Sequence, residues 1–364
     1  MRGNQAILRV VLALGRHSTL VMFVAGFFFD FFTMQRIDAW RDLAYQLGCL
    51  AGLTGLLVFQ HREAMGSWVP RGILERPWRY NLEALHFLYG GLLSAYVVLY
   101  FRSSTAATPA IFVALLAGVM VLNEVPRVQR TGTLLRLGLY GFCVLSFLIY
   151  FIPVVLGRIN GWVFLVSLLS SAGVVWLVTR WLVPSDADRW AARTRLFAPA
   201  GGVLVLIAVL YVLRLIPPVP LSVQFQGIYH DIRREQGGYT LVYDEPPAWR
   251  LWRRDSRTFK RRDGDRLHYF ARVFAPSGFS HRVVIRWEFF DETRSAWKTT
   301  DRIPLDLVGG RAAGFRGTAV KANVVPGTWR VTAETEDGRA ISRLSFSVED
   351  DTSAGERRWR TLRG

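Results

Sequence analysis

Long apolar runs fill the first 215 residues of this 364-residue chain and then stop, and this restricts its fold more than any other feature. A helix that crosses a bilayer needs about 20 residues, most of them apolar. The segments that satisfy this requirement are residues 18–34, 42–60, 83–101, 108–124, 137–156, 161–181 and 200–216. The sequence therefore predicts an all-α membrane bundle of about seven transmembrane helices over residues 1–216. The first segment is short and carries an acidic residue, so a re-entrant or tilted helix is the alternative there.

Arginines are unevenly distributed between the connections of these predicted helices. One set of connections, which includes the N-terminal segment, holds Arg2, Arg9, Arg16, Arg62, Arg71, Arg76, Arg79, Arg127, Arg130, Arg136, Arg180, Arg189, Arg193 and Arg195. The alternate set holds Arg36, Arg41, Arg102, Arg158 and Arg214. Basic residues favour the cytoplasmic side, so the N-terminus is predicted in the cytoplasm and, after seven crossings, the C-terminal region outside it. An even number of crossings would reverse the second conclusion.

The basic composition points to topology and not to nucleic acid. In a soluble protein a net charge of +17 would suggest a nucleic-acid partner. Here many arginines lie between apolar runs, and no stripe of basic residues matches a known nucleic-acid module, so we expect none. Cys49 and Cys143 lie inside apolar runs, which leaves no disulfide framework or CxxC metal site. No metal site and no cofactor are predicted.

The pattern changes after a proline-rich linker at residues 217–221. Val283, Ile285 and Trp287 alternate with Arg286 and Glu288, as expected for a strand with one buried face. Similar short runs recur up to residue 348, separated by clusters of Gly, Pro and Asp. This spacing predicts an all-β antiparallel sandwich of the immunoglobulin-like type over residues 222–349. Residues 350–364 are predicted to be a polar, frayed tail.

Charged and polar residues within the apolar segments are candidates for function, because each is costly at the centre of a bilayer unless it is paired or wetted. Arg36 or Arg102 could reach Asp30, and Asp30 is interpreted as part of a structural ion pair, as a substrate or proton site, or as a residue exposed at the interface. His86 and Glu124 lie toward the inner end of their helices, where they could handle a proton or bind a metal. The alternative, which we prefer, is that they lie at headgroup level or form buried hydrogen bonds between helices.

Candidate binding residues of the β-rich region are aromatic rings and arginines, which suit anionic lipid headgroups or phosphorylated glycans. The alternative is that these side chains only pack or brace loops. The candidates are Trp249, Trp252, Arg253, Arg254, Arg286, Trp287, Arg311 and Arg316.

The C-terminal motifs resemble a known bacterial domain. The runs 326–331, 334–339, 346–348, 286–287 and 314–317 resemble the domain of unknown function 2914. The runs 26–30, 90–96, 123–124 and 216–220 resemble the polytopic segment attached to some of its members. This resemblance implies an architecture and carries no established activity. In that domain His often precedes the Trp, whereas Arg286 stands here, so no histidine-dependent role is expected at this position.

These observations lead to two functional hypotheses. The first is a non-enzymatic protein of the bacterial inner membrane, whose periplasmic domain binds an anionic lipid, an envelope glycan or a periplasmic protein. The second is a transporter or membrane-embedded enzyme for a lipid-linked or anionic substrate. We prefer the first, because a β-sandwich without a catalytic cluster is more often a recognition module, although a fold alone does not establish a function.

Overall fold

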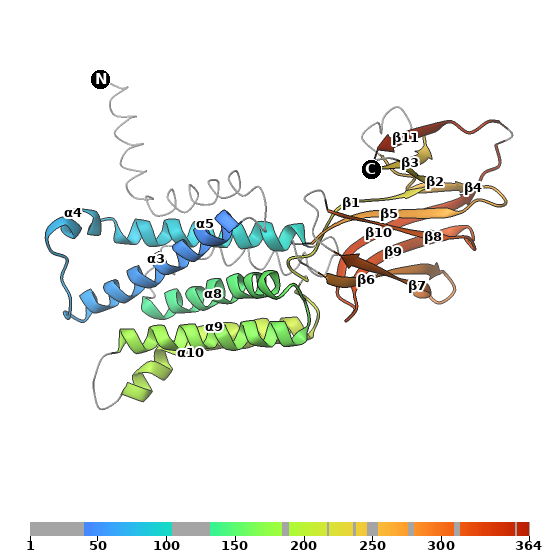
Figure 1. Ribbon diagram of the computed structural model, residues 1–364. Helices are drawn as coiled ribbons and strands as arrows, with labels where there is room; N and C mark the ends of the chain where they lie inside the picture. Colours follow the sequence, from blue (N-terminus) through green and yellow to red (C-terminus); the bar gives the residue numbers. More distant parts are fainter. Residues whose placement is uncertain are drawn as a thin grey trace, which may run out of the picture. The chain divides into compact units, whose positions relative to one another are not determined.

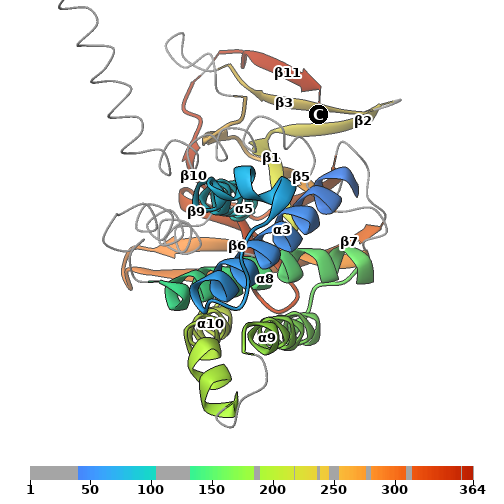
Figure 2. The ribbon, with the colours of Figure 1, turned by 90° about the vertical axis from the view of Figure 1, so that its left-hand side faces the viewer.

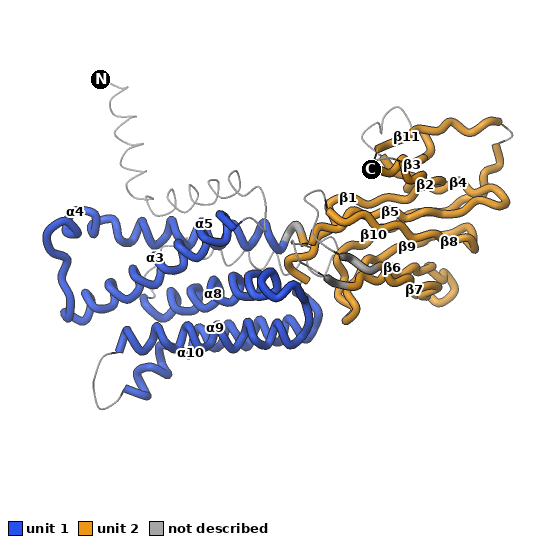
Figure 3. Tube along the Cα trace, viewed as in Figure 1, with its two compact units in different colours: residues 1–101, 108–216 blue, residues 102–107, 217–364 orange. Residues whose placement is uncertain are grey.

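The computed structural model describes residues 40–103, 132–183, 189–216, 218–235, 238–245, 254–275, 280–308, 314–353 and 355–363. The chain divides into two compact units (Figure 3). The first consists of Met1–Phe101 with Thr108–Ile216, and the second of Arg102–Ala107 with Pro217–Gly364. Helices form the described part of the first unit, and strands dominate the second (Figure 1).

Five of the described helices are long and apolar enough to cross a membrane. They are α3 (Trp40–Ala64), α5 (Asn81–Arg102), α8 (Thr133–Leu156), α9 (Gly161–Leu182) and α10 (Arg189–Val212). A 3-10 turn, η1 (Gly72–Leu74), and a short helix, α4 (Glu75–Trp78), lie between α3 and α5. The five long helices coincide with five predicted segments. The other two segments, 18–34 and 108–124, lie outside the described residues.

Local sequence sets two of the helix ends. Asn160 precedes α9, and its side-chain oxygen accepts a hydrogen bond of 2.9 Å from the amide of Val163. This satisfies a free amide of the first turn. Helix α8 ends at Gly157, whose φ of 64° is left-handed and whose amide donates to the carbonyl of Pro153. Glycine adopts this conformation at little cost, so it stops the helix there.

Small residues at four-residue spacing, such as Gly48 and Gly52 in α3, can let two helices approach closely. Gly48 has open space where a Cβ would lie, and a Cβ on Gly52 would be 3.4 Å from Leu88 of α5. A Cβ on Gly141 would be only 2.7 Å from the Cβ of Ala200. Helices α8 and α10 therefore approach closely at Gly141, and α9 packs against both (Figure 2). Spacing identifies small residues but does not show which of them face another helix.

The β-rich unit contains eleven strands among its described residues. They are β1 (Ser222–Tyr229), β2 (Asp231–Glu235), β3 (Gly238–Asp244), β4 (Thr258–Arg261), β5 (Leu267–Phe274), β6 (Ser280–Asp291), β7 (Ala296–Val308), β8 (Phe315–Lys321), β9 (Gly327–Thr335), β10 (Ala340–Asp350) and β11 (Trp359–Arg363). They form three sheets, with the orders β1-β5-β8, β4-β10-β9-β6-β7 and β11-β3-β2. All pairs are antiparallel except β10 with β4, which is parallel.

The apolar core lies on one face of the five-stranded sheet. Trp287 of β6 is fully buried, and its ring lies 6.3 Å from that of Tyr269 on β5 and 6.5 Å from that of Phe346 on β10. Val283 and Ile285 are also fully buried on β6, as the alternation predicts. The side chains of β6 that alternate with them lie on the other face of this sheet.

The last residues form a strand, where the sequence analysis predicts a frayed tail. Strand β11 pairs with β3 from Trp359 opposite Asp244 to Arg363 opposite Thr240. Leu362 packs against a buried cluster of Tyr229, Leu241, Tyr243 and Phe270. A mostly polar composition did not reveal this strand, because its docking depends on the free edge of β3, on Leu362 and on the contact of Trp359 with the ring of His230.

Candidate functional site

Arginines and glutamates occupy the second face of the five-stranded sheet. The register aligns Arg343 of β10 with Thr332 of β9, Thr332 with Arg286 of β6, and Arg286 with Arg302 of β7. Adjacent strands lie about 4.8 Å apart, so this row extends over roughly 14 Å. The neighbouring positions on the same face hold Arg330, Glu288 and Glu334. We call Arg286, Glu288, Arg302, Arg330, Glu334 and Arg343 the arginine face.

Glu288 is bound by two hydrogen bonds from one guanidinium. Arg330 Nε donates to Glu288 Oε2 over 2.6 Å, and Arg330 Nη2 donates to Oε1 over 2.8 Å. Such a planar, two-bond pair fixes the orientation of both side chains. Arg286 Nη1 lies 3.6 Å from Glu288 Oε1. The indole ring of Trp297 lies 4.1 Å from the Arg330 guanidinium, which gives a cation–π contact.

Glu334 lies between Arg302 and Arg286, which are adjacent in the row. Arg302 Nη2 donates to Glu334 Oε1 over 2.6 Å, and Arg286 Nε lies 3.1 Å from Glu334 Oε2. The side chains of Glu288 and Glu334 are only 4% and 2% exposed, whereas that of Arg302 is 56% exposed. The carboxylates therefore lie beneath the guanidinium groups, and the arginines form the outer layer.

Positive charge is in excess at this face, with four arginines and two glutamates. Arg343 Nε is buried and has no hydrogen-bond partner among the described residues. Burial lowers the pKa of Arg343, and the charges of Arg330 and Arg286 lower it further, against the opposing effect of Glu288 and Glu334. Arg343 therefore lies in a crowded cationic environment that an additional anion would stabilise.

The pKa of Glu288 reflects the same imbalance. Burial of its carboxylate acts to raise the pKa. The hydrogen bond from Arg330 and the charges of Arg286, Arg330 and Arg343 act in the opposite direction and hold the pKa of Glu288 below its usual range. Glu288 is thus ionised at neutral pH, although little of its side chain is accessible to water.

The predicted binding residues lie at different places in the structure and do not form one site. Arg286 lies in the arginine face, whereas Trp287 packs in the core on the opposite face of the sheet. Arg254 is exposed, and its carbonyl accepts a hydrogen bond of 3.1 Å from Tyr229. Arg316 lies on β8, opposite Arg272 of β5. The remaining candidates, Trp249, Trp252, Arg253 and Arg311, lie outside the described residues.

Several arginines of the basic stretch at residues 250–266 form ion pairs within the chain. Arg257 pairs with Asp255, with Nε and Oδ2 2.6 Å apart, and Arg262 pairs in the same way with Asp351 at 2.7 Å. Arg261 Nη2 lies 3.0 Å from Asp350 Oδ1. The last residue of β10, Asp350, and the residue after it, Asp351, thus supply two of the carboxylates. These guanidinium groups are less available to an external anion than their sequence suggests.

The intramembrane candidates are described only in part. Asp30, Arg36 and Glu124 lie outside the described residues, and Arg102 ends α5 without a described side chain. His86 is buried on α5, with 3% of its surface exposed. The structure therefore does not bring these five residues together as one described site.

A polar group that the sequence analysis did not predict joins α3, α5 and α8. Gln60 Nε2 donates to Asn81 Oδ1 over 2.6 Å, and Arg136 Nη1 donates to Gln60 Oε1 over 2.9 Å. Tyr89 donates to the carbonyl of Arg136 over 2.6 Å. These bonds satisfy polar groups where three helix ends meet, and they fix the position of Arg136.

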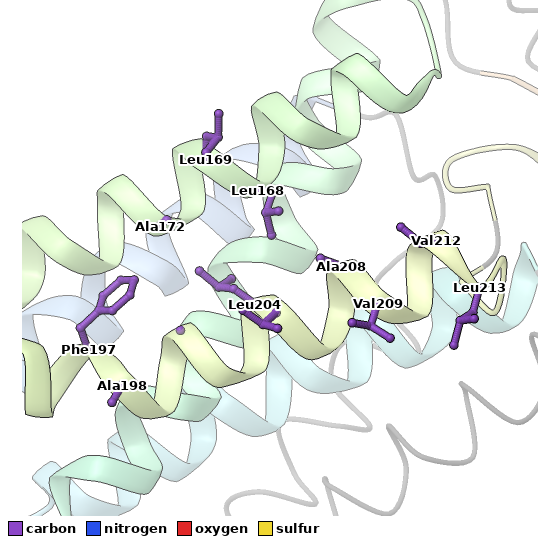
Figure 4. A pocket seen from close by; sticks show the side chains of 12 residues that line it. Leu168, Leu169, Ala172, Phe197, Ala198, Leu204, Ala208, Val209, Val212 and Leu213 are labelled. Carbon is purple, nitrogen blue, oxygen red and sulfur yellow. The ribbon is translucent and has the colours of Figure 1, made fainter.

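An apolar groove runs between α9 and α10 and has a volume of about 630 Å³ (Figure 4). Leu168 and Ala172 line it from α9, and Phe197, Leu204 and Val209 line it from α10. All of its lining residues are apolar or glycine, so the groove suits hydrocarbon and not an ion. Among the described residues, no group of three or more His, Cys, Asp and Glu side chains could hold a metal ion.

The arginine face could be predicted only in part. The alternation of Arg286 with Trp287 is visible in the sequence, and so is that of Arg330 with Val331. The pairing of Glu288 with Arg330 and of Glu334 with Arg302 depends on strand order, because these residues are 42 and 32 positions apart. For Arg343, nothing in the sequence apart from its charge indicated that it belongs to the arginine face.

Comparison with known proteins confirms the resemblance of the C-terminal region. Apolar helices followed by antiparallel sheets define the class of architecture. Within it, residues 280–348 match the model of the family described as "Protein of unknown function (DUF2914)". The matched range includes all six residues of the arginine face. No curated protein matches the chain.

Two solved structures give weak matches. A β-glucosidase from Kluyveromyces marxianus is 12% identical over 35% of this chain and 15% of that chain, with a TM-score of 0.19. The alkylpurine DNA glycosylase AlkC from Pseudomonas fluorescens, bound to DNA with an abasic site analog, is 10% identical over 84% of this chain and 98% of that chain, with a TM-score of 0.21. Scores this low support no conclusion about fold or function.

Proposed function

We propose that this chain is a multi-pass protein of the bacterial inner membrane whose C-terminal β-sandwich is a periplasmic binding module. About seven helices anchor it, with the N-terminus in the cytoplasm. The five apolar helices support the anchor, and the distribution of arginines between connections supports the orientation. The module acts by binding and not by catalysis.

The observation that carries the binding role is the arginine face. Its two buried carboxylates orient guanidinium groups and leave two positive charges uncompensated. Guanidinium groups bind carboxylates and phosphates through paired hydrogen bonds. A row of roughly 14 Å suits a ligand that carries several anionic groups, as an envelope glycan or an acidic protein segment does.

The first test uses full-length protein in nanodiscs and two probes, fluorescein-labelled decaglutamate and labelled polyphosphate. The variant Arg302→Gln with Arg343→Gln removes both ends of the row, and we expect its Kd for at least one probe to rise by about tenfold. Arg233→Gln with Arg234→Gln on β2 removes the same charge from another surface and serves as the matched control.

The salt dependence gives a second measurement. Binding through several ion pairs should weaken steeply as ionic strength rises. Equal Kd values for the arginine-face variant and the β2 control would contradict the proposed site. Binding that neither salt nor these substitutions affects would contradict electrostatic recognition altogether.

A further inference from the structure

One end of the helical unit collects most of its described basic residues. The C-terminal ends of α3 and α9 lie there with the N-terminal ends of α5, α8 and α10 (Figure 1). Arg62 Nη2 donates to the carbonyl of Trp181 over 3.5 Å, and Arg136 contacts Gln60, so these ends are adjacent. We call this the arginine-rich end. Its described arginines are Arg62, Arg71, Arg76, Arg79, Arg136, Arg180, Arg189, Arg193 and Arg195.

Few acidic residues balance these arginines. The described acids of the same end are Glu63, Glu75 and Glu83. Nine arginines and three glutamates leave a large positive excess where several predicted membrane spans meet water. Such an excess attracts anionic lipid headgroups.

Aromatic rings hold the connection between α3 and α5 against the end of α3. The ring of Trp68 lies 4.8 Å from that of Phe59 and 4.7 Å from that of Trp78. Trp78 Nε1 donates to Glu63 Oε2 over 2.7 Å. Tryptophan is enriched where hydrocarbon meets headgroups, because its ring is apolar and its N–H is polar. These contacts fix the connection at the level of the helix ends.

The same connection exposes aliphatic side chains beside its arginines. Ile73 is 95% exposed and Leu74 is 56% exposed, and both lie in the turn η1. Arg71 precedes this turn, and Arg76 follows it in α4. Exposed aliphatic groups flanked by cations are typical of elements that lie in the interface of a bilayer.

We propose that residues 65–80 form an interfacial element that inserts Ile73 and Leu74 among acyl chains and binds the phosphates of anionic lipids through Arg71, Arg76 and Arg79. The partner is the lipid of the membrane that the helices cross. Continuity with α3 and α5, the charge excess and the exposed aliphatic residues all favour this partner. The inference rests on the membrane-spanning part of the proposed function and is independent of the arginine face.

The first experiment measures the depth of residue 73 in vesicles. The full-length variant Ile73→Cys is labelled with the fluorophore NBD and reconstituted in phosphatidylcholine that contains some phosphatidylglycerol. Cys49 and Cys143 are buried. The parent protein, treated with NBD in the same way, shows how much label these two cysteines take up. We expect blue-shifted emission and strong quenching by doxyl-labelled lipid. The matched control is Ser295→Cys in the exposed β6–β7 turn, for which we expect the emission of a probe in water.

The second experiment measures the preference for anionic lipid. Quenching at residue 73 is compared for doxyl-phosphatidylglycerol and doxyl-phosphatidylcholine at equal mole fractions. We expect the anionic quencher to be enriched at least about twofold around the label. Substitution of Arg71, Arg76 and Arg79 by Gln should abolish the enrichment, whereas substitution by Lys should retain most of it.

Three outcomes would overturn the inference. An NBD label at residue 73 that emits as it does in water would exclude insertion. Equal quenching by the two lipids would exclude the headgroup preference. Loss of enrichment in inorganic phosphate, but not in chloride of equal ionic strength, would indicate a site for free phosphate. Flotation of the chain with vesicles on a density gradient tests the membrane-spanning part of the proposed function separately. A chain that floats but fails the quenching tests contradicts only the interfacial element, whereas a chain that does not float contradicts the membrane-spanning part as well.

Discussion

Arg330 and Glu288 form a planar two-bond ion pair across β9 and β6, with donor–acceptor distances of 2.6 and 2.8 Å. The carboxylate is nearly inaccessible to water, yet it lies on the face of the sheet opposite the apolar core. Arg330, Arg286 and Thr332 surround it. Glu288 therefore positions Arg330 and Arg286 within the arginine face.

Replacement of Glu288 by Gln should destabilise the β-rich region. The substitution leaves Arg330 and Arg286 close together without their shared anion, and loss of one partner of a buried pair costs about 3 kcal/mol. Denaturant unfolding of the full-length protein in detergent, followed by tryptophan fluorescence, measures the effect. Glu349→Gln on the exposed end of β10 is the control and should change the unfolding free energy by less than about 0.5 kcal/mol.

Acid should destabilise the same region. The folded-state pKa of Glu288 is lowered, as is that of Asp337, where burial is outweighed by bonds from Thr335 and Arg339. A lowered carboxyl pKa contributes stability that is present above the unfolded pKa of about 4 and is lost as pH falls through the folded pKa. We expect a constant unfolding midpoint above about pH 5 and a decline below it. A Glu288→Gln variant should decline less. A midpoint that rises toward acid would contradict both pKa directions.

Trp287 and Trp297 should differ in their contribution to stability. Trp287 is fully buried between Tyr269 and Phe346, so Trp287→Ala leaves a large cavity and should cost about 4 kcal/mol. Trp297 is half-buried, and Trp297→Ala removes mainly its contact with Arg330 and Phe290, which should cost about 1 kcal/mol. Thermal unfolding of the two variants tests this order. Equal losses would mean that the apolar core does not lie at Trp287.

Strand β11 should contribute to the order of β3. Leu362→Asp places a charge against Tyr229 and Leu241, and it should detach β11 and expose the edge of β3. Hydrogen exchange of the amides in residues 239–243 should accelerate by about tenfold or more. Thr361→Asp changes the neighbouring, exposed position and should leave the exchange rates near those of the parent. Equal rates in both variants would show that Leu362 does not anchor the strand.

The contact between α8 and α10 should depend on Gly141. A methyl group at this position would lie 2.7 Å from the Cβ of Ala200, so Gly141→Ala must separate the helices and should cost about 1–3 kcal/mol. Gly173→Ala on α9 meets open space and should be neutral or slightly stabilising, because alanine favours a helix. The thermal unfolding midpoint of each variant in detergent measures this difference in stability. Equal midpoints would contradict the close packing.

The sequence by itself determined the long helices and the buried face of β6. Apolar runs of about 20 residues identify five of the described helices, because a segment long enough to cross a bilayer must satisfy its backbone internally. Alternation identified the buried face of β6, since successive side chains of a strand point to opposite faces. The motifs of the C-terminal region also indicated the family that matches residues 280–348.

Only the tertiary structure decided which elements meet. Glu288 and Arg330 are 42 residues apart, and their contact depends on the antiparallel register of β6 with β9. Strand β11 depends on the free edge of β3, and the packing at Gly141 depends on the rotation of α8 toward α10. Local patterns report the environment of each residue along its own element. Pairing between elements comes from many weak contacts over the whole fold, and a single sequence does not contain their geometry.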